Sequence, residues 1–276
     1  MVYIKSAEEI RAIREGGRRL AVILKRLLSE IKPGVDTGYL EDLANDLIAK
    51  AGGRSAFKNY PMAGGAFFPS TLCVSLNDEV VHGAAYPVRT LKSGDIVDLD
   101  IGMEWPVDAE LREKYKLPIN SHSKNGGFFT DTCATGGVGK ISSDAKKLLQ
   151  VSYKCLELAL KAVKPGKTIN DIARAVSSCA ESHGYGVVRD LVGHGVGYFS
   201  HEKPDVFNFE ISERSWENIV LRPGMVIAVE PMINEGDWRV KMADNDYTIL
   251  TADGSLSAHF EHTVAVTEDG CEVLTK

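Results

Sequence analysis

The chain has 276 residues, of which 44% are hydrophobic and 25% are charged, so it can bury a substantial core. A formal net charge of -6, without any block of five basic residues, argues against a nucleic-acid surface. No apolar run is long enough to cross a bilayer, and residues 1–20 lack the apolar stretch of a secretory leader. The five cysteines are odd in number and form no CxxC pair, which predicts reduced thiols in the cytoplasm and no thiolate zinc site.

The N-terminal part of the chain predicts two helices followed by irregular structure. Ser6 and Glu9 are spaced as a capping box, and apolar residues then recur at helical spacing until Pro33-Gly34 ends the pattern. Thr37 is placed to cap a second helix. Residues 54–82 predict irregular structure with short strands.

A buried strand that ends in acid is predicted for residues 94–100. Its centre consists of strand formers, and Gly94 marks the turn that precedes it. Asp98 and Asp100 are two residues apart, so a strand projects both from one face. Carboxylates are costly to bury unless they are paired, hydrogen-bonded or bound to metal. The rest of the chain must therefore supply their partners.

Residues 104–127 are polar and rich in proline, asparagine and glycine, which predicts an exposed insertion between two strands. The second strand resumes at Phe128 and carries Asp131. Two further helices are predicted to begin near Ser143 and Thr168.

Two turns recur in the two parts of the chain. Residues 31–34 (IKPG) match residues 163–166 (VKPG), and residues 91–94 (LKSG) match residues 221–224 (LRPG). Each matching turn precedes a predicted helix or strand of the same kind. Chance resemblance is the weaker explanation, because the two matches occur at nearly equal separations.

The repeat predicts a single catalytic domain over residues 1–276, with halves of about 6–135 and 140–270 related by a pseudo-two-fold axis. Under the alignment of the strand-forming turns, Asp100 falls on Glu230. Two related halves would bring these acids to a shared central cleft.

Four carboxylates and one imidazole on separate predicted strands form a candidate metal site: Asp100, Asp131, His194, Glu230 and Glu261. Converging carboxylates repel one another, and two divalent cations would neutralise them. A carboxylate-rich site with one imidazole suits Mn, Fe or Co, or a hydrolytic Zn pair. Two metals about 3.5–4 Å apart share a water and lower its pKa, which is hydrolytic chemistry.

Each residue also has an ordinary explanation. A lone acid at a strand end commonly pairs with a surface Lys or Arg, and a lone histidine is commonly structural, as expected for His122 and His183. Asp98 is expected in a turn or beside the ligands rather than as a ligand. His259 shares a strand face with Glu261, so it is a candidate to support the ligands without binding metal.

Four blocks carry a resemblance to a known family: residues 74–83 (VSLNDEVVHG), 193–197 (GHGVG), 229–232 (VEPM) and 256–263 (LSAHFEHT). Together they make the chain similar, nearly end to end, to the type I methionine aminopeptidases. The resemblance implies an α+β pita-bread fold, with two pseudo-two-fold-related helix and strand halves around a central antiparallel sheet.

The resemblance also implies roles for individual residues. The five metal ligands would hold two divalent ions (Co, Mn, Fe or Zn), with Asp131 and Glu261 bridging them. His82 and His201 would bind the substrate and stabilise the tetrahedral intermediate, while Glu230 would also shuttle a proton. Cys73, Phe68 and Trp238 fall where the family lines its pocket for the methionine side chain.

The implied activity is removal of the N-terminal methionine from nascent proteins and peptides with a small second residue, by a metal-bridged hydroxide. The implied partners are nascent polypeptide N-termini, with the ribosome as a further candidate. We expect no specific nucleic acid, no membrane, and a cytoplasmic monomer.

The sequence departs from the family pattern at several positions. Besides residues 104–127, Ser200 stands where an aromatic pocket residue is common, and His259 replaces a commoner amide. One alternative is a proline-specific aminopeptidase or dipeptidase, which shares the ligands but usually carries an N-terminal domain for which this chain leaves no room. Another is a pita-bread protein that binds a partner without catalysis, although such proteins lose ligands that are all present here.

Overall fold

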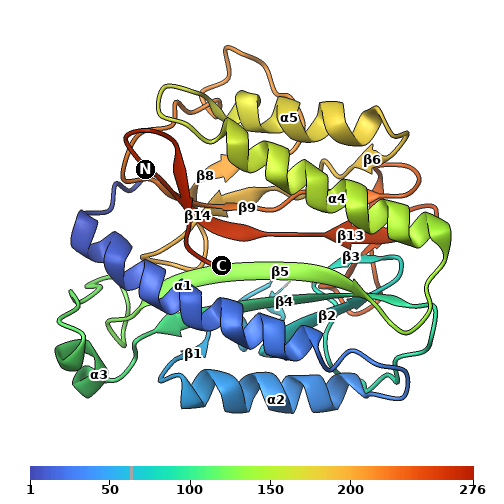
Figure 1. Ribbon diagram of the computed structural model, residues 1–276, viewed down its shortest axis with the longest axis horizontal. Helices are drawn as coiled ribbons and strands as arrows, with labels where there is room; N and C mark the ends of the chain where they lie inside the picture. The colour runs from blue at the N-terminus through green and yellow to red at the C-terminus, as the bar shows by residue number, and fades with distance from the viewer. Residues whose placement is uncertain (63–64) are drawn as a thin grey trace.

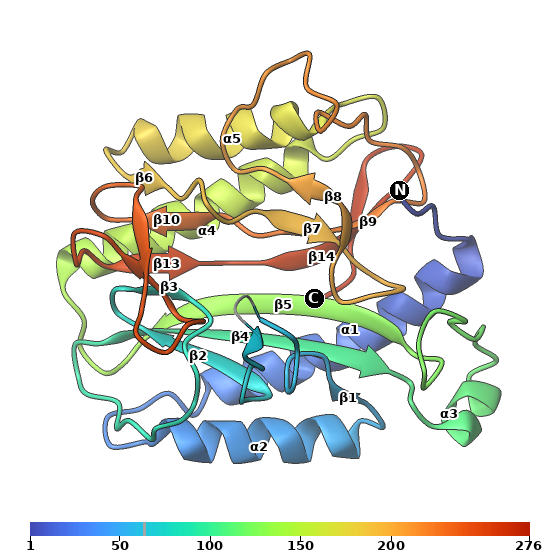
Figure 2. The ribbon, with the colours of Figure 1, turned by 180° about the vertical axis from the view of Figure 1, so that it is seen from behind.

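The computed structural model describes residues 1–62 and 65–276. Strands occupy the middle of the molecule, and two pairs of long helices lie on its outside (Figures 1 and 2). One pair is α1 (Ala7–Leu28) and α2 (Thr37–Lys50), and the other is α4 (Ser143–Ala162) and α5 (Ile169–Glu181). This combination of helices and antiparallel strands confirms the predicted α+β class. Within the described ranges, no helix is both long enough and apolar enough to cross a membrane.

The helix starts follow the predicted local signals with one exception. The Glu9 N–H donates to the Ser6 hydroxyl at 3.3 Å, and the Ser6 N–H donates to the Glu9 carboxylate at 2.8 Å, which closes the capping box of α1. Asp36, not Thr37, occupies the N-cap position of α2, and its side chain makes no capping hydrogen bond. The Thr37 hydroxyl instead donates to the Ala85 carbonyl at 2.6 Å, so a tertiary contact overrides its capping preference.

The first sheet contains β1 (Arg54–Ser55), β2 (Leu72–Leu76), β4 (Ile96–Trp105) and β5 (Phe128–Gly137). Strands β4 and β5 pair antiparallel along their whole length, from Ile96 opposite Gly137 to Trp105 opposite Phe128. Helix α1 packs on both strands, and all residues of β4 are buried. The hydrophobic core that includes residues of α1 takes every second residue of β4, namely Val97, Leu99, Ile101, Met103 and Trp105.

The remaining strands lie mainly in the second half of the chain. A five-stranded sheet has the order β15 (Cys271–Val273), β14 (His262–Val266), β9 (Val226–Val229), β7 (Gly193–Gly195) and β8 (Glu202–Val206). Two smaller sheets consist of β13 (Ser257–His259), β10 (Met232–Asn234) and β6 (Gly186–Val187), and of β11 (Val240–Met242), β12 (Ile249–Thr251) and β3 (Glu79–Val81). An antiparallel bridge between Ala134 and Phe260 joins the two halves at the centre of the molecule.

The two matching pairs of turns make the same hydrogen bond. The Gly34 N–H donates to the Leu91 carbonyl at 2.8 Å, and the Gly166 N–H donates to the Leu221 carbonyl at 3.0 Å. Both glycines have left-handed φ values, +89° and +81°, which a residue with a side chain adopts only with strain. The sequence repeat therefore corresponds to a repeated backbone contact.

The polar segment after β4 begins later than predicted and is less exposed. Glu104 and Trp105 belong to β4 and are fully buried, so the excursion covers residues 106–127 and contains the short helix α3 (Ala109–Lys114). The Glu104 carboxylate pairs with Arg54 and accepts a 3.0 Å hydrogen bond from Asn125. This buried acid fastens the excursion to the sheet, which its polar composition did not reveal.

Candidate metal centre and active site

Three acidic residues project from one face of the paired strands β4 and β5. Asp98 lies opposite Thr135, Asp100 opposite Cys133, and Asp131 opposite Gly102. Residues directly opposite each other in an antiparallel pair share a face, so both acids of β4 and Asp131 project to the same side. That side faces the second half of the molecule.

The second half contributes the other predicted ligands from β7, the end of β9 and the residue before β14. His194 lies in β7, Glu230 directly follows β9, and Glu261 directly precedes β14. A Cβ at Gly193 would lie 2.5 Å from the Ala228 carbonyl oxygen, so only glycine allows β7 to approach β9 this closely. The close approach sets His194 beside Glu230.

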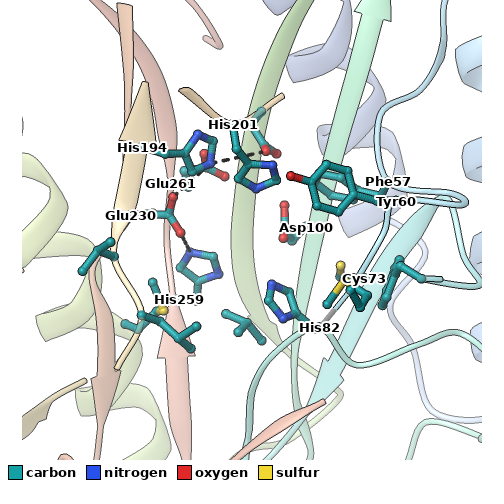
Figure 3. A pocket seen from close by; sticks show the side chains of 17 residues that line it. Phe57, Tyr60, Cys73, His82, Asp100, His194, His201, Glu230, His259 and Glu261 are labelled. Carbon is teal, nitrogen blue, oxygen red and sulfur yellow. Dashed lines mark ion pairs between the residues drawn. The ribbon is translucent and has the colours of Figure 1, made fainter. Parts of the chain in front are cut away.

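All five predicted ligands line one cavity of about 240 Å³ (Figure 3). The His194 Nε2 lies 3.4 Å from Glu230 Oε1 and 4.0 Å from Asp131 Oδ2. Ligand atoms of Asp131, His194 and Glu261 all lie within 4.8 Å of one another. The His194 Nδ1 is 2.9 Å from the Gly195 carbonyl, which assigns the proton to Nδ1 and leaves the Nε2 lone pair facing the acids.

The carboxylates of this cluster are buried and short of partners. Within the described chain, one oxygen each of Asp100, Asp131, Glu230 and Glu261 is buried without a hydrogen-bond partner. Burial raises the pKa of Asp131 to about 6. Burial, reinforced by the charge of Asp131, raises the pKa of both Asp100 and Glu261 well above the usual range. Orphaned oxygens around a free imidazole nitrogen are a donor set that fits divalent cations.

Two other histidines face the same cavity without joining the carboxylate cluster. The His201 ring lies 4.3 Å from the His194 ring and 4.9 Å from the Tyr60 ring. His82 follows β3 with φ +59°, and its carbonyl accepts a 3.0 Å hydrogen bond from the Thr248 hydroxyl. Burial lowers the pKa of His82 and lowers that of His201 well below its usual value, so both rings are neutral hydrogen-bonding groups at neutral pH.

The cavity also has an apolar wall. Phe68 and Cys73, the two residues expected in a methionine pocket, belong to this wall. The wall also contains residues that the sequence did not point to: Phe57, Tyr60, Met62, Val81, Leu191, Val192 and Met232. Most come from irregular segments without periodicity, and the aromatic residues clustered at 57–68 were the one available signal.

Trp238 is not among the residues that line the cavity. Its ring lies between the guanidinium groups of Arg189 and Arg239, at 4.8 and 5.0 Å, beyond the end of β10. The edge of the Tyr247 ring instead meets Phe68, with centroids 5.6 Å apart. The segment between Trp238 and Glu261 contains the paired strands β11 and β12, and Tyr247, between them, packs against Phe68.

Asp98 and Asp100 project from the same face of β4 but lie in different surroundings. Asp100 lines the cavity, whereas Asp98 is 2% exposed and lies deeper, beside Thr135 and His259. Burial lowers the pKa of the His259 imidazole, but the carboxylates of Asp98 and Glu230 more than offset this, and the pKa is raised well above its usual value.

Comparison with known proteins agrees with this geometry. The model of metallopeptidase family M24 matches residues 11–110 and 105–268. Methionine aminopeptidase 1 of Bacillus subtilis (strain 168) is 38% identical, with all of both chains covered. Methionine aminopeptidase of Escherichia coli (strain K12) is 35% identical, covering 99% of this chain and 94% of that protein.

Solved structures give the same result. A methionine aminopeptidase from Thermotoga maritima superposes with a TM-score of 0.87 at 36% identity, with both chains fully covered. An Xaa-Pro dipeptidase from Bacillus anthracis shares the fold, with a TM-score of 0.72 at 22% identity, and this chain spans 62% of it. The chain belongs to metallopeptidase family M24 and has its pita-bread fold.

Proposed function

We propose that the protein is a methionine aminopeptidase, which removes the N-terminal methionine from proteins and peptides whose second residue is small. The observation that carries the proposal is the convergence of four buried carboxylates and one imidazole on a cavity with an apolar wall. Full-length relatives named methionine aminopeptidase support the same activity. The substrates would be nascent N-termini in the cytoplasm, a reducing compartment in which five free thiols are stable.

The residues that would hold two divalent cations are Asp100, Asp131, His194, Glu230 and Glu261. When bound there, such ions supply an activated water and polarise the scissile carbonyl. Asp131 and Glu261 would act as ligands together with His194, since ligand atoms of the three lie within 4.8 Å of one another. Cobalt, manganese, iron and zinc all suit this donor set.

The chain's own groups complete the chemistry. Phe68 and Cys73, with the other apolar residues of the wall, would accept the thioether side chain of methionine. His82 and His201 would donate hydrogen bonds to the peptide and to the developing oxyanion, since both rings are neutral. The Glu230 carboxylate would accept a proton from the attacking water and return it to the leaving amine.

The test is methionine release from a Met-Ala-Ser peptide by purified protein supplied with Co²⁺ or Mn²⁺. We expect rapid release from this peptide and none from its N-acetylated form, because the site is proposed to recognise a free terminal amine. A Met-Leu-Ser peptide should be a poor substrate. Absence of release with every divalent metal would refute the proposal.

A proline-specific exopeptidase is the competing outcome of the same assay. It would release Xaa from an Xaa-Pro peptide but no methionine from Met-Ala-Ser. The solved proline-specific relatives share only the fold with this chain at about a fifth identity, so we expect the Xaa-Pro peptide to remain intact.

A further inference from the structure

A buried imidazole that belongs to neither the proposed ligands nor the proposed substrate-binding pair lines the same cavity beside Glu230. His259 belongs to β13 and is 2% exposed. Its backbone N–H donates to the Thr135 hydroxyl oxygen at 2.9 Å, which ties β13 to β5 at this point. Among residues 1–62 and 65–276, neither ring nitrogen has a hydrogen-bond partner of ordinary length. A buried imidazole of this kind needs partners for both nitrogens.

The nearest groups to the two nitrogens are carboxylates on opposite sides of the ring. Nδ1 is 3.4 Å from Asp98 Oδ2, and Nε2 is 3.6 Å from Glu230 Oε2 (Figure 3 shows the second pair). The Thr135 hydroxyl lies 3.1 Å from the other Asp98 oxygen, Oδ1, and 2.8 Å from the His259 carbonyl, so it contacts both residues. Thr135, Asp98, His259 and Glu230 therefore form a continuous buried row.

The two oxygens of Glu230 face different groups. Oε1 lies 3.4 Å from His194 Nε2, on the side of the proposed cation site, and Oε2 faces His259. The Glu230 backbone is fixed separately, since its carbonyl accepts a 3.0 Å hydrogen bond from the Asn208 amide. This bond does not fix the Glu230 side chain, and His259 is positioned to orient its carboxylate.

We propose that His259, held from behind by Asp98, is a positioning residue that fixes Oε2 of Glu230 and so directs Oε1 to the metal site. The proposal rests on the proposed function for the identity of Glu230 as a ligand. It gives a role to Asp98 and His259, which are neither proposed metal ligands nor proposed substrate-binding residues.

A third cation site is the alternative use of the same residues. Ligand atoms of Asp98, Cys133 and His259 lie within 4.8 Å of one another. However, neither Asp98 nor Cys133 lines the cavity. His259 Nε2 also faces Glu230 rather than Cys133. The geometry therefore favours a chain of oriented side chains over a further ion.

The test compares full-length variants at position 259 that differ in their donor. His259→Leu removes the donor at similar volume, whereas His259→Gln keeps an amide N–H in reach of Glu230. Cobalt binding is measured by titration calorimetry and by the visible absorption spectrum of Co²⁺, and methionine release is assayed on the same preparations. His183→Leu, at the surface end of α5, is the matched control.

We expect His259→Leu to weaken binding of one Co²⁺ ion by about 10–100-fold and to change its spectrum. His259→Gln should recover most of the affinity, and His183→Leu should match the original protein. Asp98→Asn should also weaken binding, and combining it with His259→Leu should add nothing, because the two residues act in one row.

Unchanged cobalt affinity and spectrum in a folded His259→Leu variant would overturn the proposal, as would equal losses in the Leu and Gln variants. A third bound ion that disappears in Cys133→Ser would establish the alternative. Should His259→Leu not fold, an Asp98→Asn variant with full affinity overturns the proposal equally. Protein that binds two ions but releases no methionine refutes the proposed function alone, since the affinity comparison still decides the role of His259.

Discussion

His194 and His201 are neighbours in the cavity with different chemistry. Their ring centroids are 4.3 Å apart, yet only His194 faces the carboxylates. The His194 proton is held at Nδ1 by the Gly195 carbonyl, which leaves Nε2 free to bind a cation. His201 packs against Tyr60 and keeps its ring available for substrate. Adjacent imidazoles can therefore be assigned separate proposed roles.

Replacing each histidine by alanine should separate metal binding from turnover. His194→Ala removes a proposed ligand, so we expect metal affinity to fall by more than about 100-fold and activity to fall with it. His201→Ala should retain the metal and lower kcat by about 10²–10³-fold, the usual effect of losing one oxyanion donor. Metal analysis with methionine release on the same samples measures both. Loss of metal in His201→Ala would contradict its assignment.

Residue types and spacing pointed to the polar half of the proposed site but not to its apolar wall. Asp100 and Glu230 each follow the glycine of a matching turn by six residues, a local pattern that the sequence displays. Tyr60 lines the cavity from an irregular segment, and Tyr247 packs against the wall residue Phe68, so both positions depend on tertiary packing that no periodicity encodes. Trp238, which was expected in the wall, is not among the residues that line the cavity.

Helix α1 shows how single contacts set the geometry of an element. Two consecutive glycines, Gly16 and Gly17, lie on its buried face. A Cβ at Gly16 would make ordinary contact with Trp105 at 3.4 Å. A Cβ at Gly17 would lie 2.5 Å from the Leu274 carbonyl oxygen, which belongs to a buried backbone segment. Only the second glycine is required by packing.

Alanine at these two positions should have opposite effects. Gly16→Ala should stabilise the protein by up to about 1 kcal/mol, because alanine is the better helix former and fits. Gly17→Ala should destabilise it by about 1–3 kcal/mol, since the collision with the backbone displaces α1 or the C-terminal segment. Free energies of unfolding from urea titration provide the measurement. Equal effects would show that α1 can shift away from Leu274 at no cost.

Elements with strong periodicity could be predicted, whereas the residues at which they begin and end depend on tertiary contacts. The four long helices follow from apolar spacing and from the Pro-Gly or glycine residues after them. The true end of β4 did not follow, because Glu104 looks like a loop residue until its buried contacts with Arg54 and Asn125 are known. Short α3 was also missed, since six residues carry too little pattern to stand out.

At the scale of the whole molecule, the proposed ligands come from both halves. Asp100 and Asp131 belong to the first sheet, and His194, Glu230 and Glu261 belong to the second half. We propose that the halves are related by a pseudo-two-fold axis within one domain, supported by the equivalent hydrogen bonds of Gly34 and Gly166. A cation bound between the halves would then stabilise their contact directly.

Removal of metal should lower the thermal stability of the entire protein. A free metal concentration 100-fold above Kd stabilises the native state by about 2.7 kcal/mol, which for a chain of this size corresponds to roughly 5–10 °C in Tm. We expect one calorimetric transition that shifts down by this amount when a chelator is added. Two transitions, of which only one responds to metal, would show that the halves melt independently.

The distribution of the proposed ligands along the chain has a consequence for the order of folding. Asp100 and Glu261 are separated by about 160 residues, so a cation that bridged them in the unfolded chain would have to close a very long loop. Zinc fingers differ, because their ligands are near neighbours in sequence and the ion itself drives folding. Here the strands must already be paired before a complete set of ligands exists. Full metal occupancy therefore reports that the chain has finished folding, and no fragment lacking either half can acquire the complete site.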